Sequence, residues 1–211
     1  TSATGLAIDA SGDAFIAGAT ANPEWPTLNA FQSHNNGAFG NIYVAKLGPG
    51  GNLVYSSFLG GSISETAGDV AVDADGALYV TGSTLSSDFP VLNSLDPPSP
   101  PFPTVNGCAL APNGGCVSAA QATKPVLAKI SPSGGLVYAS LFGGSYPDYN
   151  MSVATAAAVD GAGNVYVTGY TNSPAFPSTR NFNRSIELAG QPGLGNVVNF
   201  AIKFAPDGRT I

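Results

Sequence analysis

An eighteen-residue pattern occurs three times in the chain and limits its possible folds more than any other feature. The copies are DASGDAFIAGATANPEWP at residues 9–26, DADGALYVTGSTLSSDFP at residues 73–90 and DGAGNVYVTGYTNSPAFP at residues 160–177. Self-similar units of this kind are typical of arrays in which neighbouring copies bury a shared core. The repeat therefore predicts several similar units packed in series.

Each copy predicts a tight hairpin of two strands, which we call strands a and b. Short alternating stretches (GLAIDA, DVAVDA, TAAAVDG) lead into a turn that contains Gly12, Gly76 or Gly163, and a second β-rich stretch follows. Glycine is suited to such turns because it adopts the positive φ that a Cβ atom disfavours.

A second hairpin follows in each unit and supplies strands c and d. Strand c reads NIYVAKLGPGG, PVLAKISPSGG and FAIKFAPDGR, and strand d reads NLVYSSFLGGS and LVYASLFGGS. Four short strands joined as an antiparallel meander, repeated radially, make a β-propeller. We therefore expect an all-β fold in a single segment, residues 1–211, with blade units at about 4–62, 68–145 and 155–211.

These motifs resemble the bacterial β-propeller repeat called SBBP. The resemblance rests on D-x-x-G-x-x-[YF]-[VI]-x-G-x-T-x5-[FW]-P, on A-K-[LI]-x-P-x-G and on L-[FG]-G-G-S, and the third unit departs from it with Ile202 before Lys203. It implies a propeller on secreted or cell-surface bacterial proteins. The family has no common set of catalytic residues, so the resemblance implies none here.

Three blades are fewer than the four to eight that close a propeller. The third unit stops at RTI, where the others continue into VYSSFLGG or VYASLFGG, so most of its fourth strand is expected to be missing. We therefore expect an arc of a larger propeller, or a partial ring that a second copy completes.

The composition disfavours several classes of partner. The net charge is −6, and the seven Lys and Arg residues are not clustered, so the chain is a poor candidate for binding nucleic acid or an anionic membrane. No apolar run approaches the roughly 18–20 residues that span a bilayer, so no membrane insertion is expected.

Two cysteines, Cys108 and Cys116, enclose a turn with the sequence ALAPNGG. We predict that they form a disulfide, which would imply an oxidising compartment; two unrelated thiols are the alternative. A zinc site is disfavoured because two sulfurs and the distant His34 do not make a four-ligand set.

Length variation is confined to the connections at one end of the blades. From the repeated Pro to the strand-c Lys the interval is 20, 39 and 26 residues (Pro26 to Lys46, Pro90 to Lys129, Pro177 to Lys203). The d–a connections also vary, whereas the a–b and c–d turns keep their lengths. Insertions gathered on one face of a repeat array often form the binding surface.

The unrepeated loops supply the candidate binding residues, because Tyr, Arg and Asn on stable loops are typical of recognition surfaces. They are Phe102, Tyr146, Asp148, Tyr149, Asn150, Arg180, Phe182 and Arg184. The alternative is that these side chains only cover loop backbone.

The repeated residues are interpreted as structural. Asp9, Asp73 and Asp160 are expected to accept hydrogen bonds from turn amides rather than to bind calcium, so no metal or cofactor is predicted. The strand-c lysines are expected to pair with a carboxylate or to cap carbonyls between blades. The aromatics before the repeated Pro are expected to pack between blades, and His34 is interpreted as an incidental loop residue; the aromatics are Trp25, Phe89 and Phe176.

The sequence favours an extracellular, non-enzymatic module that binds a protein or glycan partner through the insertion-bearing face. An alternative is a loop-borne lyase or hydrolase that acts on a polysaccharide or small molecule. It would require titratable groups to meet in a cleft, and the candidates are His34, Asp148, Glu24, Glu65, Glu187 and Lys124. A third reading is a spacer that binds nothing.

Overall fold

The computed structural model describes residues 1–94, 104–105, 108–110, 116–117, 123–143, 151–173, 176 and 197–208. These residues form strands, turns and connections. No helix among them is long and apolar enough to cross a membrane.

Three antiparallel sheets correspond to the three repeat units, and we call them blades 1, 2 and 3. Blade 1 contains β1 (Ser2–Ile8), β2 (Ala14–Thr20), β3 (Asn41–Leu47) and β4 (Leu53–Leu59), paired in that order. Blade 2 contains β5 (Glu65–Val72), β6 (Leu78–Thr84), β10 (Lys124–Ile130) and β11 (Leu136–Leu141). Blade 3 contains β12 (Ser152–Val159), β13 (Val165–Thr171) and β14 (Val198–Phe204).

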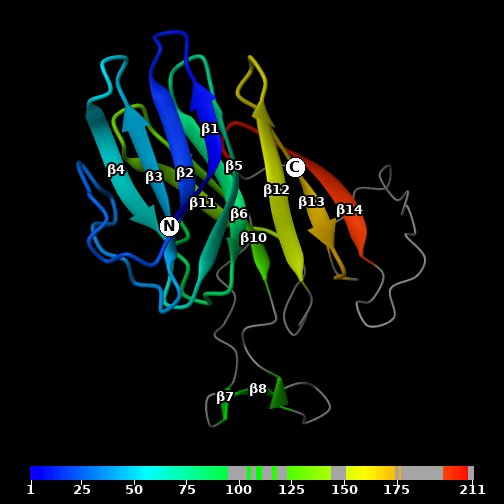
Figure 1. Cartoon of the computed structure of the whole chain (residues 1–211). Coiled ribbons are helices and arrows are strands. Elements are labelled where there is room, and N and C mark those ends of the chain that lie inside the picture. Colours follow the sequence, from blue (N-terminus) through cyan, green and yellow to red (C-terminus); the bar gives the residue numbers. More distant parts are fainter. Residues whose placement is uncertain are drawn as a thin grey trace.

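A smaller three-stranded sheet lies within the b–c connection of blade 2. It is made of β7 (Thr104–Val105), β8 (Cys108–Leu110) and β9 (Cys116–Val117). Figure 1 shows β7 and β8 beyond the ends of the blade strands, on the side where the b–c connections run. The a–b turns lie at the opposite end.

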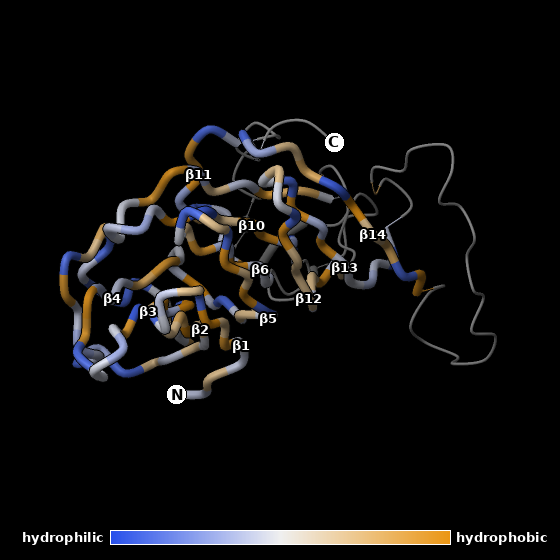
Figure 2. Tube along the Cα trace, turned by 90° about the horizontal axis from the view of Figure 1, so that it is seen from above, coloured by the Kyte–Doolittle hydropathy of each residue, from blue (hydrophilic) through white to orange (hydrophobic). Residues whose placement is uncertain are grey.

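The blades radiate from their first strands. β1, β5 and β12 gather near the middle of the view from above, and β4, β11 and β14 lie farther out (Figure 2). The sheets formed by the described residues do not close into a ring. The sequence prediction of an all-β fold with meander blades of the propeller type is confirmed.

The core lies between blades rather than within them. One apolar cluster joins Phe15 and Val44 of blade 1 to Val80 and Leu141 of blade 2. A second joins Tyr79 and Phe142 of blade 2 to blade 3, where Phe142 meets the Phe204 ring edge-on at 5.0 Å. Alternate residues of a strand point into the cluster on one face of its blade, and the residues between them point to the opposite face, because a strand is pleated.

The a–b turns are built by the repeated Asp, as the sequence predicts. Asp73 Oδ1 accepts hydrogen bonds from the amides of Asp75 at 3.1 Å and Ala77 at 2.8 Å. The Gly76 amide donates to the Asp73 carbonyl at 3.0 Å, and Gly76 takes a φ of 79°. Asp9 and Asp160 repeat this pattern of side-chain bonds in their own blades.

Replacing Gly76 with valine is expected to lower the free energy of unfolding by about 1–3 kcal/mol, because a β-branched residue is forced into positive φ. Denaturant titration monitored by circular dichroism measures the change. Alanine at Gly161, which has no heavy atom within 4 Å of an added Cβ, is the control. An unfolding midpoint equal to that of the parent would contradict the prediction.

Strand a carries a bulge at the same place in every blade. The register shifts between Ala3 and Gly5 in β1, between Ala67 and Asp69 in β5, and between Ala154 and Ala156 in β12. The residue that pairs just before each bulge faces the glycine of strand b: Gly18, Gly82 or Gly169. A Cβ on any of these glycines would overlap a carbonyl oxygen of strand a. The fixed spacing of the strand-b glycine follows from this close approach.

The outer edge of each complete blade is covered by the start of its own b–c connection. Leu28 exchanges two backbone hydrogen bonds with Ser56 of β4, at 3.0 and 2.8 Å, and Leu92 does the same with Ala139 of β11. The following residue, Asn29, takes a φ of 49° and donates from Nδ2 to the Val54 carbonyl at 3.1 Å.

Asn93 repeats the bond to Val137 at 3.2 Å. Val54 and Val137 are the residues left unpaired where the register of strand d shifts. The repeated P-x-L-N segment therefore protects a sheet edge that would otherwise be open.

Candidate binding face

The eight binding residues predicted from sequence all lie outside the described residues: Phe102, Tyr146, Asp148, Tyr149, Asn150, Arg180, Phe182 and Arg184. Their role remains a prediction. The end of the blades to which they belong is nevertheless described at blades 1 and 2. We call residues 32–40, 60–64 and 85–89 at this end the platform.

In the platform, the b–c connection of blade 1 runs beside the connection that leads into blade 2. The Phe39 amide donates to the Ile63 carbonyl at 2.9 Å, and the Ala38 amide donates to the Ser62 carbonyl at 3.1 Å. Gly40 and Ser64 form a parallel bridge. Backbone pairing thus holds the two variable connections together as one surface.

A buried polar cluster lies beneath the platform. Asn41 Oδ1 accepts from the amides of Asn36 and Gly37 at 2.8 and 3.2 Å. Asn41 Nδ2 donates to the Gly61 carbonyl at 2.9 Å and to Glu65 Oε2 at 2.6 Å. Asn41 therefore links the blade 1 loop, the d–a connection and strand β5 through one side chain.

Glu65 completes this cluster from blade 2 and is only 3 % exposed. Its Oε1 accepts a hydrogen bond from the Thr84 hydroxyl at 2.6 Å. Thr1 and Ser152 occupy the equivalent positions in the other blades and bond the equivalent threonines at the same distance. The Glu65 side chain is longer than those of Thr1 and Ser152, so it also reaches Asn41 of blade 1. This second contact explains why a titratable residue occupies a structural position in blade 2.

Within the platform, Asp88 joins the segment that follows strand b of blade 2 to the connection at residues 60–64. Its Oδ1 accepts from the Ser62 amide at 2.9 Å and from the Ser62 hydroxyl at 3.0 Å. The Ile63 amide donates to Ser86 Oγ at 2.9 Å. The platform is held from both sides by side chain-to-backbone hydrogen bonds, so it is pre-organised.

The exposed surface of the platform carries an aromatic residue that the sequence analysis missed. Phe39 is 75 % exposed although both its neighbours along the chain are ordered by hydrogen bonds. Ser33, His34 and Asn36 are exposed on the same connection. The signal that could have found Phe39 is its place between Gly37 and Gly40, outside the alternation of strand c.

Of the titratable candidates for the enzyme alternative, Asp148 and Glu187 lie outside the described residues, so that alternative stays a prediction. Glu65 is committed to Asn41 and Thr84, and the His34 ring bonds the neighbouring Ser33 hydroxyl at 2.8 Å. Lys124 lies in β10 opposite Thr84. No group of three His, Cys, Asp or Glu residues among those described could hold a metal ion.

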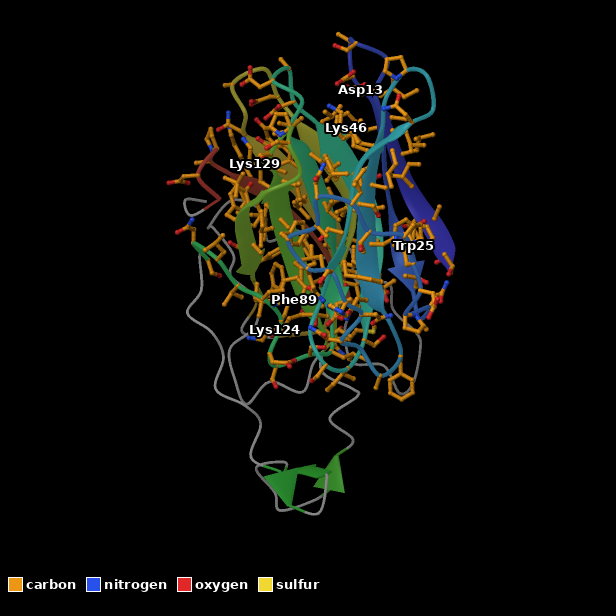
Figure 3. The ribbon with its side chains drawn as sticks, turned by 90° about the vertical axis from the view of Figure 1, so that its left-hand side faces the viewer. Asp13, Trp25, Lys46, Phe89, Lys124 and Lys129 are labelled. Carbon is orange, nitrogen blue, oxygen red and sulfur yellow. The ribbon has the colours of Figure 1, made fainter. Side chains whose placement is uncertain are left out.

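The opposite end of the blades carries an ion pair in blade 1 and another in blade 2, in which the repeated lysine meets carboxylates at different positions of the repeat. Lys46 Nζ lies 2.8 Å from Asp13 Oδ2 and 4.9 Å from the centre of the Phe15 ring. Lys129 Nζ lies 3.3 Å from Asp73 Oδ2 and 4.8 Å from the Tyr79 ring. Figure 3 shows Asp13, Lys46 and Lys129 near this end, and Phe89 and Lys124 near the other.

The prediction that the strand-c lysines pair with carboxylates is confirmed for Lys46 and Lys129, although each pair lies within one blade and joins strand c to the a–b turn. Burial alone raises the pKa of Asp73. The hydrogen bonds from the Ala77 amide and the Tyr79 hydroxyl, together with the Lys129 charge, outweigh burial and leave the pKa below its ordinary value. The Asp73 carboxylate is therefore charged in the folded state, and its role is structural.

The same turn in blade 3 predicts a pH-dependent contribution to stability. The Asn164 side-chain amide, at 2.8 Å from Asp160 Oδ2, is the main cause that lowers the pKa of Asp160 from 3.8 to about 2. Because the folded-state pKa is depressed, the stabilisation is present above about pH 4 and is lost as the pH falls through about 2. We expect the difference in unfolding free energy between the parent and Asp160→Asn to shrink over this range.

Urea titrations at successive pH values measure that difference. A gap between the two proteins that stays constant from pH 5 to about pH 2 would contradict the assigned direction. The control variant for Asp160→Asn is Asp88→Asn, which replaces a carboxylate at the other end of the blades.

The aromatics that precede the repeated Pro give a mixed result. Phe89 is buried in the cluster between blades 1 and 2, and Phe176 stacks on Phe200 at 4.5 Å beside Gly143 of blade 2. The prediction of inter-blade packing is confirmed for these two. Trp25 lies against Tyr43 of its own blade at 4.1 Å and donates to Ser56 Oγ at 3.0 Å. It is on the side of blade 1 that no described blade covers, so inter-blade packing of Trp25 stays a prediction.

The two cysteines lie on paired strands of the small sheet. The ladder of β8 and β9 places Cys116 opposite Leu110, two residues from Cys108. Their side chains are outside the part of the chain that the structure describes. The disulfide therefore stays a prediction.

If the disulfide forms, neither cysteine of the unreduced, denatured protein is expected to react with a thiol-labelling reagent, and both react after reduction. Mass spectrometry counts the labels. Reduction should change the unfolding midpoint only slightly, because the short closed loop contains no blade core. Two labels without reduction would contradict the prediction.

The comparisons with known proteins agree with this architecture. A search of curated proteins found no match. The model of the beta-propeller repeat family, SBBP, matches residues 137–176. These residues run from β11 of blade 2 through β12 and β13 of blade 3, so they span the junction between consecutive blades. The resemblance seen in the sequence is thus confirmed, and the chain carries the SBBP beta-propeller repeat.

Proposed function

We propose that the chain is an extracellular, non-enzymatic propeller module that binds a protein or glycan partner through the platform and the long connections beside it. The observation that carries this proposal is Phe39. A large aromatic side chain that is 75 % exposed on a backbone-paired surface is more typical of a binding site than of a loop that only covers the fold.

The construction of the platform supports binding rather than catalysis. Asp88 of the platform and Glu65 beneath it accept hydrogen bonds that hold the connections in place. The exposed polar side chains on the same connection as Phe39 are those of Ser33, His34 and Asn36, which donate and accept hydrogen bonds. A connection that carries both an exposed aromatic ring and such groups suits the apolar face and hydroxyls of a sugar, or a polar protein surface.

The proposed extracellular location rests on the repeat family, and the charge bears on the class of partner. The net charge of −6 and the low content of Lys and Arg favour neither nucleic acid nor an anionic membrane. The repeat family implies secreted or cell-surface proteins, and the predicted disulfide would need an oxidising compartment.

A glycan array, combined with a pull-down from culture supernatant, tests the proposal. We expect a specific glycan or protein to bind the parent, and Phe39→Ala to weaken that binding at least about tenfold. Val137→Ala is the matched control, because Val137 is an exposed apolar residue on the outer rim of blade 2. Binding that both variants reduce equally, or that neither reduces, would overturn the assignment of the platform.

Incubation of the parent with the bound glycan tests the non-enzymatic part. We expect the glycan to be recovered intact. Released fragments or new unsaturated ends would favour the lyase or hydrolase alternative.

A further inference from the structure

Each of the two outer blades presents one side that no described blade covers. Ala7, Phe15 and Ala17 of blade 1 pack toward blade 2, so the alternating residues Leu6, Ile8 and Ile16 point the other way. We call this side the β1 face; Gly51, in the c–d turn of blade 1, belongs to the same side. Leu6 and Ile8 are 65 % and 64 % exposed.

The equivalent residues of blade 2, the inner blade, indicate what the β1 face contacts. Val70 stands in blade 2 where Leu6 stands in blade 1, and Val80 stands where Ile16 stands. Both valines are buried against blade 1 in the first apolar cluster. The same positions are thus apolar in both blades, but only blade 2 has a described neighbour on that side.

The turn glycines give independent support. A Cβ on Gly134 of blade 2 would stand 2.8 Å from Tyr55 of blade 1, and one on Gly208 of blade 3 would stand 2.7 Å from Tyr138 of blade 2. Gly51 holds the same place in blade 1, with a φ of 80°, and nothing lies within 4 Å of its Cβ position. The c–d turn of blade 1 therefore has the glycine that in blades 2 and 3 lies against a tyrosine of the preceding blade. No described residue lies against it in blade 1.

Blade 3 presents the complementary side, which we call the β14 face. Val165, Val167 and Ile202 pack toward blade 2, so Tyr166 and Lys203, which are paired across β13 and β14, point the other way. Lys203 Nζ lies 5.2 Å from the Tyr166 ring.

This arrangement repeats the Lys46–Phe15 pair of blade 1 and the Lys129–Tyr79 pair of blade 2. Phe15 and Tyr79 are fully buried by the next blade, whereas Tyr166 is 41 % exposed.

We propose that the β14 face of one copy of this chain binds the β1 face of a second copy, head to tail. The contact continues the interface that already recurs between blades 1 and 2 and between blades 2 and 3. It uses different surfaces on the two partners, so it is heterologous, and such contacts close into rings when the rotation permits. Two copies would bring six blades together, within the four to eight that close a propeller.

Sedimentation velocity over the micromolar range tests the proposal with the parent, Ile8→Asp and Lys203→Glu. The parent is expected to form dimers or larger assemblies. Each variant loses one face: Ile8→Asp places a charge in the apolar β1 face, and Lys203→Glu reverses the charge beside Asp160. We expect each variant alone to associate at least about tenfold more weakly than the parent.

An equimolar mixture of the two variants separates a heterologous contact from any other. Each variant keeps the face that the other has lost, so the mixture is expected to recover a dimer with one intact interface. Val137→Asp on the outer rim is the control and should assemble like the parent. Circular dichroism and thermal unfolding of each variant establish that it is folded.

A parent protein that stays monomeric would overturn the proposal and favour further blades, of the same or another polypeptide, on these faces. Assembly that both face variants leave unchanged, or a mixture that remains monomeric, would overturn it as well. The outcome is independent of the platform, because Phe39 belongs to neither face.

Discussion

Replacing Gly82 with alanine is expected to lower the free energy of unfolding by at least about 3 kcal/mol. Gly82 pairs with Ala67 next to the bulge of β5, and an added Cβ would overlap the Thr66 carbonyl oxygen. It would also stand 3.1 Å from the Ala67 Cα. Backbone atoms on both sides cannot turn away as a side chain can, so β5 and β6 would have to separate.

Urea denaturation of Gly82→Ala and of Gly161→Ala measures the effect and its control. Gly161 lies in the a–b turn of blade 3 with open space at its Cβ position, so alanine there should change stability by no more than about 0.5 kcal/mol. Equal midpoints for the two variants would show that the strands of blade 2 do not approach as described.

Replacing Asp73 with alanine is expected to cost about 3–4 kcal/mol, because one change removes a turn and leaves a half-buried cation without its partner. Asp73 holds the turn amides through Oδ1 and bonds both Lys129 and the Tyr79 hydroxyl through Oδ2. The Tyr79 ring is fully buried between blades 2 and 3, so the loss extends to the inter-blade contact.

The matched control is Asp160→Ala, which removes the same turn bonds where Tyr166 is exposed and no described blade lies beyond it. We expect that variant to be clearly less destabilised than Asp73→Ala. Adding Lys129→Met to Asp73→Ala should recover part of the loss, since the unpaired charge is removed. No recovery, together with equal losses at Asp73 and Asp160, would mean that the ion pair contributes nothing.

The parts of the fold that the sequence predicted are those that depend on local chemistry repeated at fixed spacing. The Asp–Gly turns, the meander order of strands and the placement of variable connections at one end follow from residues close together in the chain. Asp73 shows this most clearly, because all its turn partners lie within four residues.

The features that the sequence did not reveal depend on contacts between distant segments. The bond from Asn41 to Glu65 joins two blades, and neither residue belongs to a repeated motif. Phe39 could not be placed because its exposure is decided by the pairing of its backbone with Ile63.

The contact between the start of each b–c connection and strand d has a signal in the sequence. PTLN at residues 26–29 and PVLN at residues 90–93 repeat directly after the eighteen-residue pattern. The varying interval from Pro to Lys predicts only an elastic connection in this region. The structure shows that the connection begins with a fixed part, which contacts strand d, before it varies.

Because the start of each connection is fixed to strand d, the length of the rest of the connection can change without disrupting the blade. In blade 1 and in blade 2 the chain clamps the outer strand through Leu28 and Asn29 or Leu92 and Asn93 before any variable residue begins. The later residues of a connection can therefore be lengthened, shortened or replaced while strand d stays covered. An uncovered edge strand could pair with other chains. The repeat keeps each blade constant while the later residues of its connections differ, so the connections can diversify at the platform end at little risk of aggregation.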